Sequence, residues 1–348
     1  MATPPEPRVV LLTGCSTGIG LAAAMAFASA GGWATLATMR SPDAAPAGLT
    51  TLPGVEVLPL DVTSEASVEA VMEHVRRAHG GRLDVVVNNA GYGVPGSIET
   101  VPLAAAQDVF DVNVWGSVRV LRAALPLMRA RGEGVVVQVS STSGTRAAPL
   151  TDVYCGSKFA IEGMLESLRY VLAPDGVSVV IVSPGPVRTP FFNRYKRSPE
   201  VADVADGGGV ATTPVATTDA DADATAAASG VPDDGLDRTR RLTDRFVAIL
   251  GERMDAPDSQ DADEVAAVIV RAATDRLGGG DPSAAPFRIG AGDAASAVLA
   301  AVRRDVDGRS GPVYEAQWER LNAEVRRVDA EAAAAKATAA AEAATAGE

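Results

Sequence analysis

The chain has 348 residues, 47% of them hydrophobic, which is enough to bury a sizeable core in one large domain or two modest ones. Its formal net charge of −13 argues against nucleic acid and against an anionic membrane surface as partners, because binding either one needs a basic face. The N-terminal MATPPEPR lacks the apolar segment of a signal peptide, and no uncharged apolar stretch reaches the roughly 18 residues of a membrane span, so a cytoplasmic protein is expected.

Cysteine and histidine are scarce. Cys15 and Cys155 form neither a disulfide framework nor a metal-binding pattern, and two buried small side chains are expected. The only histidines, His74 and His79, lie in EHVRRAHGG, which indicates the exposed end of a helix. The sequence therefore offers little for a histidine-based triad or a zinc site, and no metal is expected.

The first part of the chain alternates apolar segments with amphipathic ones. Helices are expected over 64–80, over 102–130 and from Asp152 onward. Ser64 is the predicted N-cap of the first of these. The other expected elements are a helix over 18–32 and strands at 9–13, 34–39, 55–61, 83–91, 134–141 and 177–185. Strands that are apolar throughout and separated by helices are typical of a parallel sheet covered on both faces. The predicted fold class is α/β, a doubly wound parallel sheet (Rossmann fold) with helices on both faces.

The composition changes after Tyr195. Ala, Asp, Thr and Gly dominate residues 196–239, so this low-complexity insertion is expected to be mobile. Helices are expected again over 244–250, 261–275 and 293–304, with a last strand at 286–290. The predicted organisation is a single domain over 8–195 and 240–325, a disordered N-terminus over 1–7 and an alanine-rich tail over 326–348.

The sequence TGCSTGIG (13–20) follows the first predicted strand and opens the first helix. Gly14 permits a tight turn, while Gly18 and Gly20 let the backbone approach a pyrophosphate and let the helix pack close to the sheet. The helix N-terminus would then face the anion. This pattern predicts a nucleotide-binding turn.

Tyr154 and Lys158 lie one helical turn apart in DVYCGSKFAIEG and so share a face. A fixed ammonium beside a phenol favours the phenolate, so Lys158 is expected to lower the pKa of Tyr154 and make it usable for proton transfer. The alternative is an ordinary pair of surface side chains.

Six motifs occur together in a fixed order. They are TGCSTGIG, NNAG (88–91), DVNVWG (111–116), VSSTSG (139–144), Tyr154-x-x-x-Lys158 and PGPVRT (184–189). In order and spacing they resemble the short-chain dehydrogenase/reductase family over about residues 8–192. DVYCGSKFAIEGMLESL and LDVNVWGSVRVLRAALP are most similar to its 17β-hydroxysteroid and retinol dehydrogenase branch.

The resemblance implies a role for each matching residue. Tyr154 is the general acid for carbonyl reduction or the base for alcohol oxidation, Lys158 holds the nicotinamide ribose, Ser141 binds the substrate oxygen, and Asn113 belongs to a proton relay. The cofactor-binding residues indicated are Gly14, Ser16, Gly18, Ile19, Gly20, Arg40, Asp61, Val62, Asn89, Gly91, Tyr154, Lys158, Val187 and Thr189. Taken singly, Ser141 also reads as a strand-end turn residue, Asn113 as a polar helix residue and Asp61 as a turn or capping aspartate.

The second predicted strand ends in ATMRSPD, which bears on the choice of cofactor. NAD enzymes of this architecture place an acid there for the ribose 2′-hydroxyl, whereas an arginine accommodates a 2′-phosphate. Thr38 and Met39 are neutral, Arg40 is cationic, and Asp43 lies beyond Pro42. NADP is therefore expected over NAD; the alternative is that Arg40 is only a solvated loop residue.

The predicted function is an NADP(H)-dependent oxidoreductase for the hydroxyl or ketone of a largely apolar small molecule, as a homodimer or homotetramer. Steroid enzymes of the resembled branch use a histidine after the PG motif, and none follows His79, so steroid specificity is not implied. The alternatives are a catalytically silent NADP-binding regulatory protein, and an epimerase or dehydratase. Retention of both Tyr154 and Lys158 argues against the first, and the glycine spacing against the second.

The loop after the sixth strand is expected to lie over the substrate crevice. Apolar residues flank the insertion on both sides and are expected to form the substrate-facing wall: Phe191, Phe192 and Tyr195 before it, and Leu242, Phe246 and Ile249 after it.

Overall fold

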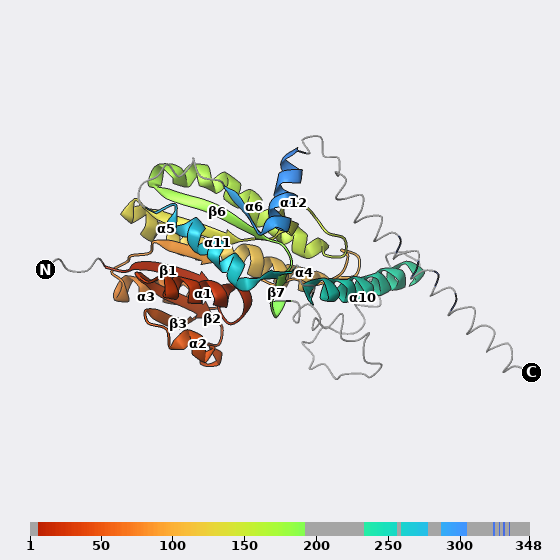
Figure 1. Ribbon diagram of the computed structural model, residues 1–348, viewed down its shortest axis with the longest axis horizontal. Helices are drawn as coiled ribbons and strands as arrows, with labels where there is room; N and C mark the ends of the chain where they lie inside the picture. Colours follow the sequence, from red (N-terminus) through yellow and green to blue (C-terminus); the bar gives the residue numbers. More distant parts are fainter. Residues whose placement is uncertain are drawn as a thin grey trace, which may run out of the picture.

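A computed structural model describes residues 6–191, 233–255, 259–277 and 287–304, together with Ala323, Arg327, Ala330 and Ala334. Its centre is a seven-stranded sheet in the order β3-β2-β1-β4-β5-β6-β9, and every pair of neighbours is parallel (Figure 1). The strands are β1 (Arg8–Thr13), β2 (Trp33–Met39), β3 (Val55–Pro59), β4 (Val85–Asn88), β5 (Gly134–Val139), β6 (Val177–Pro184) and β9 (Arg288–Ala291). The order reverses between β1 and β4, and in such sheets ligands bind beyond the carboxyl ends of the strands at that point.

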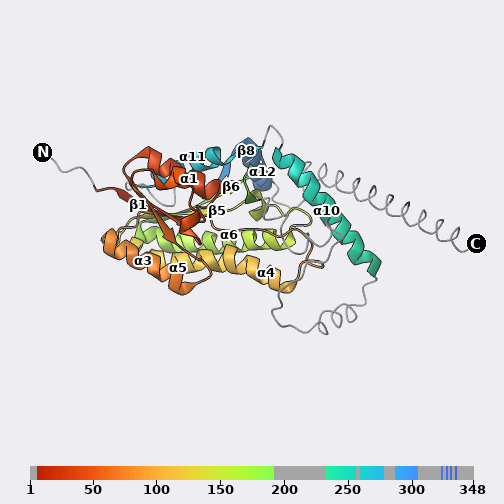
Figure 2. The same cartoon turned by 90° about the horizontal axis from the view of Figure 1, so that it is seen from below.

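Helices cover both faces of the sheet, as Figure 2 shows. On one face Phe27, Val265 and Ile269 belong to the same buried apolar cluster as the strand residues Val10 and Leu12. On the other face Val71, Val120 and Ile161 are buried with Leu11 and Leu36. The helices of the first face are α1 (Gly18–Ala30) and α11 (Ala262–Thr274), and those of the second are α3 (Glu65–Ala78), α5 (Ser117–Arg131) and α6 (Asp152–Leu172).

These observations confirm the predicted α/β fold class, including the last strand near 286–290. The expected long helix over 102–130 consists of α4 (Leu103–Phe110), a π-helical turn (Asp111–Gly116) and α5, with Pro126 inside α5. The other helices in the described residues are α2 (Ala47–Thr50), α10 (Asp233–Asp255) and α12 (Asp293–Arg304), and short 3-10 turns lie at Pro42–Ala44, Thr142–Gly144 and Ala173–Asp175.

The segment after β6 begins with β7 (Val187–Arg188), which pairs with β8 (Gln260–Asp261). Arg188 strengthens this pairing by donating two hydrogen bonds to Asp261 Oδ1, at 3.0 and 2.7 Å. Helix α10 contacts β7 and begins at Asp233, so the last seven residues of the insertion predicted at 196–239 belong to a helix. The rest of that insertion, and the tail beyond Arg304 apart from four residues, lie outside the described residues. None of the described helices is long and apolar enough to span a membrane.

Ser64 is the N-cap of α3, as its position predicted, and its hydroxyl accepts a hydrogen bond from the Ser67 N–H at 3.2 Å. We expect Ser64→Ala to lower the free energy of unfolding by about 1 kcal/mol, because a helix-terminal N–H loses its acceptor. Ser64→Gly is the control, since glycine at an N-cap lowers it by only about 0.3 kcal/mol. Urea unfolding followed by circular dichroism measures both, and equal losses would contradict a capping role.

Candidate active site

The glycine turn is held in place by polar contacts between the ends of β1 and β4. The Thr13 hydroxyl accepts hydrogen bonds from the N–H groups of Asn89 (3.0 Å) and Ala90 (2.9 Å). The Asn89 amide donates in return to the carbonyl oxygens of Thr13 (2.9 Å) and Gly14 (3.1 Å). Asn89 thus fixes the turn itself. Thr13 was not among the predicted site residues, although its place as the last residue of β1 was a usable signal.

Two glycines in this turn have backbones that other residues rarely adopt. Gly14 has φ +73° and Gly18 has φ +59°. A methyl group on Gly14 would lie 2.9 Å from the Ala90 Cα, and one on Gly20 would overlap the Gly14 carbonyl oxygen. Close packing of the turn against the end of β4 therefore requires Gly14 and Gly20, whereas Gly18 is favoured by its positive φ and by its contact with Thr189.

The start of α1 fits an anionic group. Its N-cap, Thr17, makes no side-chain capping bond, and its first turn holds no acidic residue. N–H groups at such a terminus suit a phosphate, and the helix dipole favours negative charge there. Ser16 and Ile19 flank this terminus and are partly buried. The residues present thus fit the pyrophosphate of a dinucleotide.

The predicted adenine-side residues follow β3. The Asp61 Oδ1 accepts hydrogen bonds from the N–H (2.9 Å) and the hydroxyl (2.7 Å) of Thr63, and the backbone bond chiefly lowers the pKa of this carboxyl group. Asp61 therefore acts as a turn aspartate, which was the structural alternative. Val62 is buried, and a methyl group on Gly116 would lie 2.7 Å from its Cγ2. A role for Asp61 and Val62 in binding adenine stays a prediction.

The loop after β6 reaches back over the glycine turn. Val187 is 6% exposed, and Thr189 lies so close to Gly18 that a methyl group there would be 3.1 Å from the Thr189 Cβ. The structure therefore places Thr189 beside the turn. Arg40, directly after β2, is exposed, and its charge acts on Asp61.

Tyr154, Ser141 and Phe191 lie together beyond the carboxyl ends of β5 and β6. The Ser141 side chain lies near enough to the Tyr154 phenol to influence its pKa, and the Phe191 ring is tilted against the Tyr154 ring with the centroids 5.8 Å apart. Ser141 also accepts a hydrogen bond from the Ser143 N–H at 3.1 Å, so it caps the 3-10 turn over Thr142–Gly144. Ser141 thus lies beside Tyr154, as predicted, and it also serves as the turn residue that was the alternative interpretation.

The expected direction of the Tyr154 pKa shift is wrong. Burial raises the pKa of Tyr154 to about 12, and the Ser141 side chain only partly opposes this rise. Tyr154 keeps part of its surface accessible, but the surrounding protein disfavours the phenolate. The Lys158 Nζ lies 5.7 Å from the centroid of the Tyr154 ring and donates to the Val139 carbonyl oxygen at 3.1 Å. Near neutral pH the phenol is protonated and can act as a donor.

Lys158 is itself strongly perturbed. It is 5% exposed, and burial lowers its pKa to about 8, with the charge of Glu162 acting in the opposite direction. A methyl group on Gly91 would lie 3.7 Å from its Nζ and 3.0 Å from the Asn113 Oδ1. The absence of a side chain at Gly91 thus leaves room beside the ammonium.

Asn113 is fully enclosed in the π-helical turn. Its amide donates to the Tyr92 carbonyl (2.8 Å) and to the Ser157 hydroxyl (3.0 Å), and its Oδ1 accepts from the Tyr92 N–H (3.0 Å). Such turns are rare and occur often at functional sites. The structure brings Asn113 to the candidate site, and the proton relay itself stays a prediction.

Glu162 is a residue that the sequence reasoning missed. It lies one turn beyond Lys158 on α6 and is 2% exposed. Its carboxylate accepts hydrogen bonds from the Ser140 hydroxyl (2.5 Å) and from the Arg288 Nε (2.9 Å). The spacing of four residues from Lys158 was a usable signal, but Arg288 comes from β9 and no local pattern points to it.

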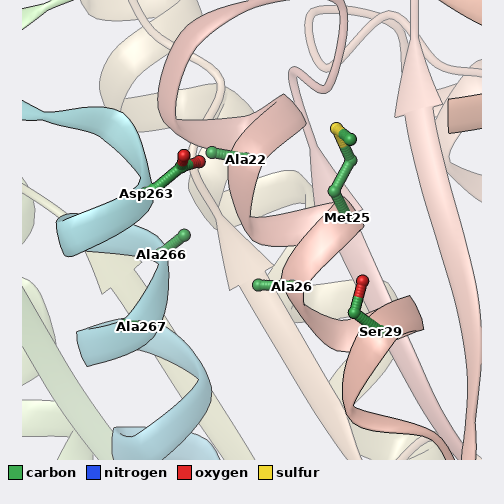
Figure 3. Close-up of a pocket in the computed structure, with 7 residues that line it drawn as sticks. All are labelled: Ala22, Met25, Ala26, Ser29, Asp263, Ala266 and Ala267. Atoms are coloured by element: carbon green, nitrogen blue, oxygen red, sulfur yellow. The ribbon is translucent and has the colours of Figure 1, made fainter. Parts of the chain in front are cut away.

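A separate hollow of about 260 Å³ lies between α1 and α11, and Figure 3 shows its lining. Its side chains are Ala22, Met25, Ala26, Ser29, Asp263, Ala266 and Ala267. Small side chains dominate, and only Ser29 and Asp263 are polar. The hollow lacks the convergent polar groups of a ligand site.

Comparison with known proteins agrees with this arrangement. The family described as short chain dehydrogenase matches residues 8–200, so the chain belongs to that family. Human 17-beta-hydroxysteroid dehydrogenase type 1 is 44% identical over 55% of this chain and 60% of its own length. Bovine retinol dehydrogenase 8 is 42% identical over 53% of this chain and 61% of its own. The chain thus matches about three fifths of each relative.

A solved structure extends the similarity beyond that segment. A short-chain dehydrogenase from Streptomyces avermitilis, 27% identical, superposes with a TM-score of 0.63 and covers 92% of this chain and 99% of its own.

The Glu162 carboxylate should hold the Lys158 pKa up, so we expect Glu162→Gln to lower it below its value of about 8. Glu166→Gln is the matched control, because Glu166 also binds Arg288 but its side chain is 50% exposed. The chain has three lysines, Lys158, Lys196 and Lys336, so an NMR titration of ¹³Cε-labelled lysine resolves them. An unchanged or higher pKa in Glu162→Gln would contradict the assignment.

Proposed function

We propose that this chain is an NADP(H)-dependent oxidoreductase that transfers a hydride between the nicotinamide and the hydroxyl or carbonyl carbon of a largely apolar small molecule. The observation that carries the proposal is the grouping of the Tyr154 phenol with the Ser141 side chain, with Lys158 buried one turn away. Family membership supports the reaction class.

The dinucleotide would lie along the carboxyl ends of the strands. The N-terminus of α1 would hold its pyrophosphate, the space left by Gly91 would take the ribose near Lys158, and Thr189 would lie close to the carboxamide. When bound, the cofactor supplies or accepts the hydride.

The chain's own residues would manage the proton. In carbonyl reduction the protonated phenol of Tyr154 donates to the substrate oxygen, which the Ser141 hydroxyl orients by a hydrogen bond. The raised pKa of Tyr154 favours this donor form. Lys158 keeps a positive charge nearby, which stabilises the phenolate left behind.

The apolar character of the substrate rests on two observations. The Phe191 ring packs against Tyr154, so an apolar surface adjoins the proton donor. The names of the two relatives, a hydroxysteroid dehydrogenase and a retinol dehydrogenase, both refer to largely apolar alcohols. Residues of α10 would complete the wall: Leu242 and Phe246 are partly buried, and Ile249 is 38% exposed.

We expect Tyr154→Phe to bind the dinucleotide as the wild type does but to lose about 10²–10⁴-fold in kcat, because only the proton donor is removed. Tyr170→Phe on the same helix, 66% exposed, is the matched control and should keep full activity. A panel of ketones and aldehydes, followed by absorbance of the reduced nicotinamide, measures both. Activity of Tyr154→Phe close to the wild type would refute the mechanism, and no turnover by the wild type on any compound would favour a silent binding protein.

We also expect the wild type to prefer NADPH to NADH. The buried Thr38 and Met39 at the end of β2 are neutral, and the exposed Arg40 that follows would accommodate a 2′-phosphate. Arg40→Ala should raise KM for NADPH about tenfold through loss of a charge-assisted hydrogen bond, with little change for NADH. Arg131→Ala, an exposed arginine at the other end of the sheet, is the control. Equal kcat/KM for the two cofactors in the wild type would refute this preference.

A further inference from the structure

The chain's only two histidines meet one carboxylate at the outer edge of the sheet. The His74 Nε2 lies 2.7 Å from the Glu56 Oε2, and the His79 Nε2 lies 3.0 Å from the Glu56 Oε1. Glu56 belongs to the edge strand β3, His74 to α3, and His79 is the C-cap of α3. A carboxylate oxygen of Glu56 and one ring nitrogen each of His74 and His79 all lie within 4.8 Å of one another.

One of these nitrogens has unused bonding capacity. The His79 Nε2 is buried and has no hydrogen-bond partner, although a carboxylate oxygen lies 3.0 Å away. A buried polar atom without a partner is destabilising and rare in folded proteins. His74, in contrast, has hydrogen-bond geometry with Glu56. The cluster of Glu56, His74 and His79 thus contains a buried imidazole nitrogen without a hydrogen-bond partner, beside a carboxylate and a second imidazole.

We propose that Glu56, His74 and His79 form a binding site for a divalent transition-metal ion, with zinc as the best match. Two imidazole nitrogens and one carboxylate oxygen are a donor set that zinc accepts, with water at the open position. The Glu56 carboxylate would balance part of the charge of the ion, and the C-terminal end of α3, where His79 lies, favours a cation.

The spacing of the donors suits this ion. Ligands at about 2.0–2.1 Å from a tetrahedral zinc lie roughly 3.3 Å from one another. The observed separations of 2.7 and 3.0 Å reach this value with outward shifts of a few tenths of an ångström. All three side chains are partly exposed, so an ion can enter from solvent.

The site is distinct from the candidate active site. Glu56 pairs in register with Leu36, in the first half of β3, whereas the dinucleotide turn follows the carboxyl end of β1. A bound ion would connect the last turn of α3 to the edge strand, so its role would be structural. The sequence predicts no metal because its two histidines lie together at one helix end and its two cysteines form no metal-binding pattern. The third ligand lies 18 residues before His74 on another element.

The test uses the full chain without a histidine tag and Zn²⁺ as the probe, at a pH of about 7.5 where most histidines are neutral. With only two histidines, a ¹H–¹⁵N long-range correlation spectrum shows just two imidazole rings. We expect one equivalent of Zn²⁺ to move both Nε2 signals to the metal-bound range, with a stoichiometry of one by calorimetry. If the histidines only serve Glu56 as hydrogen-bond partners, neither signal moves, and that overturns the proposal.

Variants then tie the binding to these residues. Glu56→Gln, His74→Gln and His79→Gln should each weaken Zn²⁺ binding at least about tenfold, since ligand or supporting-group losses in metal sites typically have effects of 10–100-fold or more. Glu73→Gln is the matched control: it removes one charge from the same helix but lies outside the cluster. Unchanged binding in Glu56→Gln, or equal loss in Glu73→Gln, overturns the proposal. Should a variant fail to fold, the wild-type imidazole signals decide.

Stability provides a second readout. Free Zn²⁺ at 100 times its Kd shifts the unfolding equilibrium about 100-fold toward the native state. We expect Tm to rise by several degrees in the wild type and in Glu73→Gln, to return to its starting value with a chelator, and to rise clearly less in His79→Gln at the same Zn²⁺ concentration. A rise of the same size in His79→Gln would show binding elsewhere and overturn the proposal.

Discussion

Much of the candidate active site depends on compensating one buried positive charge. The Lys158 ammonium is 5% exposed, and a buried cation without partners is strongly destabilising. Its compensation comes from the Val139 carbonyl at the end of β5 and from the charge of Glu162 one turn further along α6. Glu162 in turn requires donors, and it finds them in Ser140 and Arg288. The Glu162 carboxylate therefore connects Lys158 on α6 with Ser140 after β5 and with Arg288 on β9, the last strand of the sheet.

Parallel strands explain why these groups meet. The carboxyl ends of β1, β4 and β5 lie at the same edge of the sheet, so Thr13, Asn89 and Ser141 all lie at that edge although the sequence separates them widely. Asn89 and Thr13 secure the glycine turn from the neighbouring strand. The helix that follows each strand then starts at this edge, which places α1 and its N-terminal N–H groups beside the site.

Features fixed by local geometry could be predicted from the sequence. The glycines of the turn, the Ser64 cap and the apolar strands each follow from backbone conformation or periodicity over a few residues. Contacts between distant elements could not be predicted in this way. Arg288 and Glu162 are 126 residues apart, and nothing near either one identifies its partner.

The shift of the Tyr154 pKa shows that local sequence patterns are equally limited in predicting electrostatic effects. Spacing alone placed an ammonium beside the phenol, which favours the phenolate. Burial acts in the opposite direction, and it depends on everything packed around the site, including Phe191 from the loop after β6. A pKa shift that depends on the three-dimensional surroundings therefore cannot be predicted from the four-residue spacing of Tyr154 and Lys158.

The segment that matches the family ends at residue 200, yet the site does not end there. Tyr154, Ser141 and Lys158 lie within the matched segment, whereas Arg288 and helix α10 lie outside it. Arg288 acts on the charge balance of Lys158 through Glu162, and α10 contacts β7 next to the loop that carries Thr189. The C-terminal part of the chain therefore contributes to the charge balance around Lys158 and packs beside the loop after β6. The family match covers Tyr154, Ser141 and Lys158 but neither Arg288 nor α10, so the contribution of these two to the site follows from contacts in the folded chain and not from the family match.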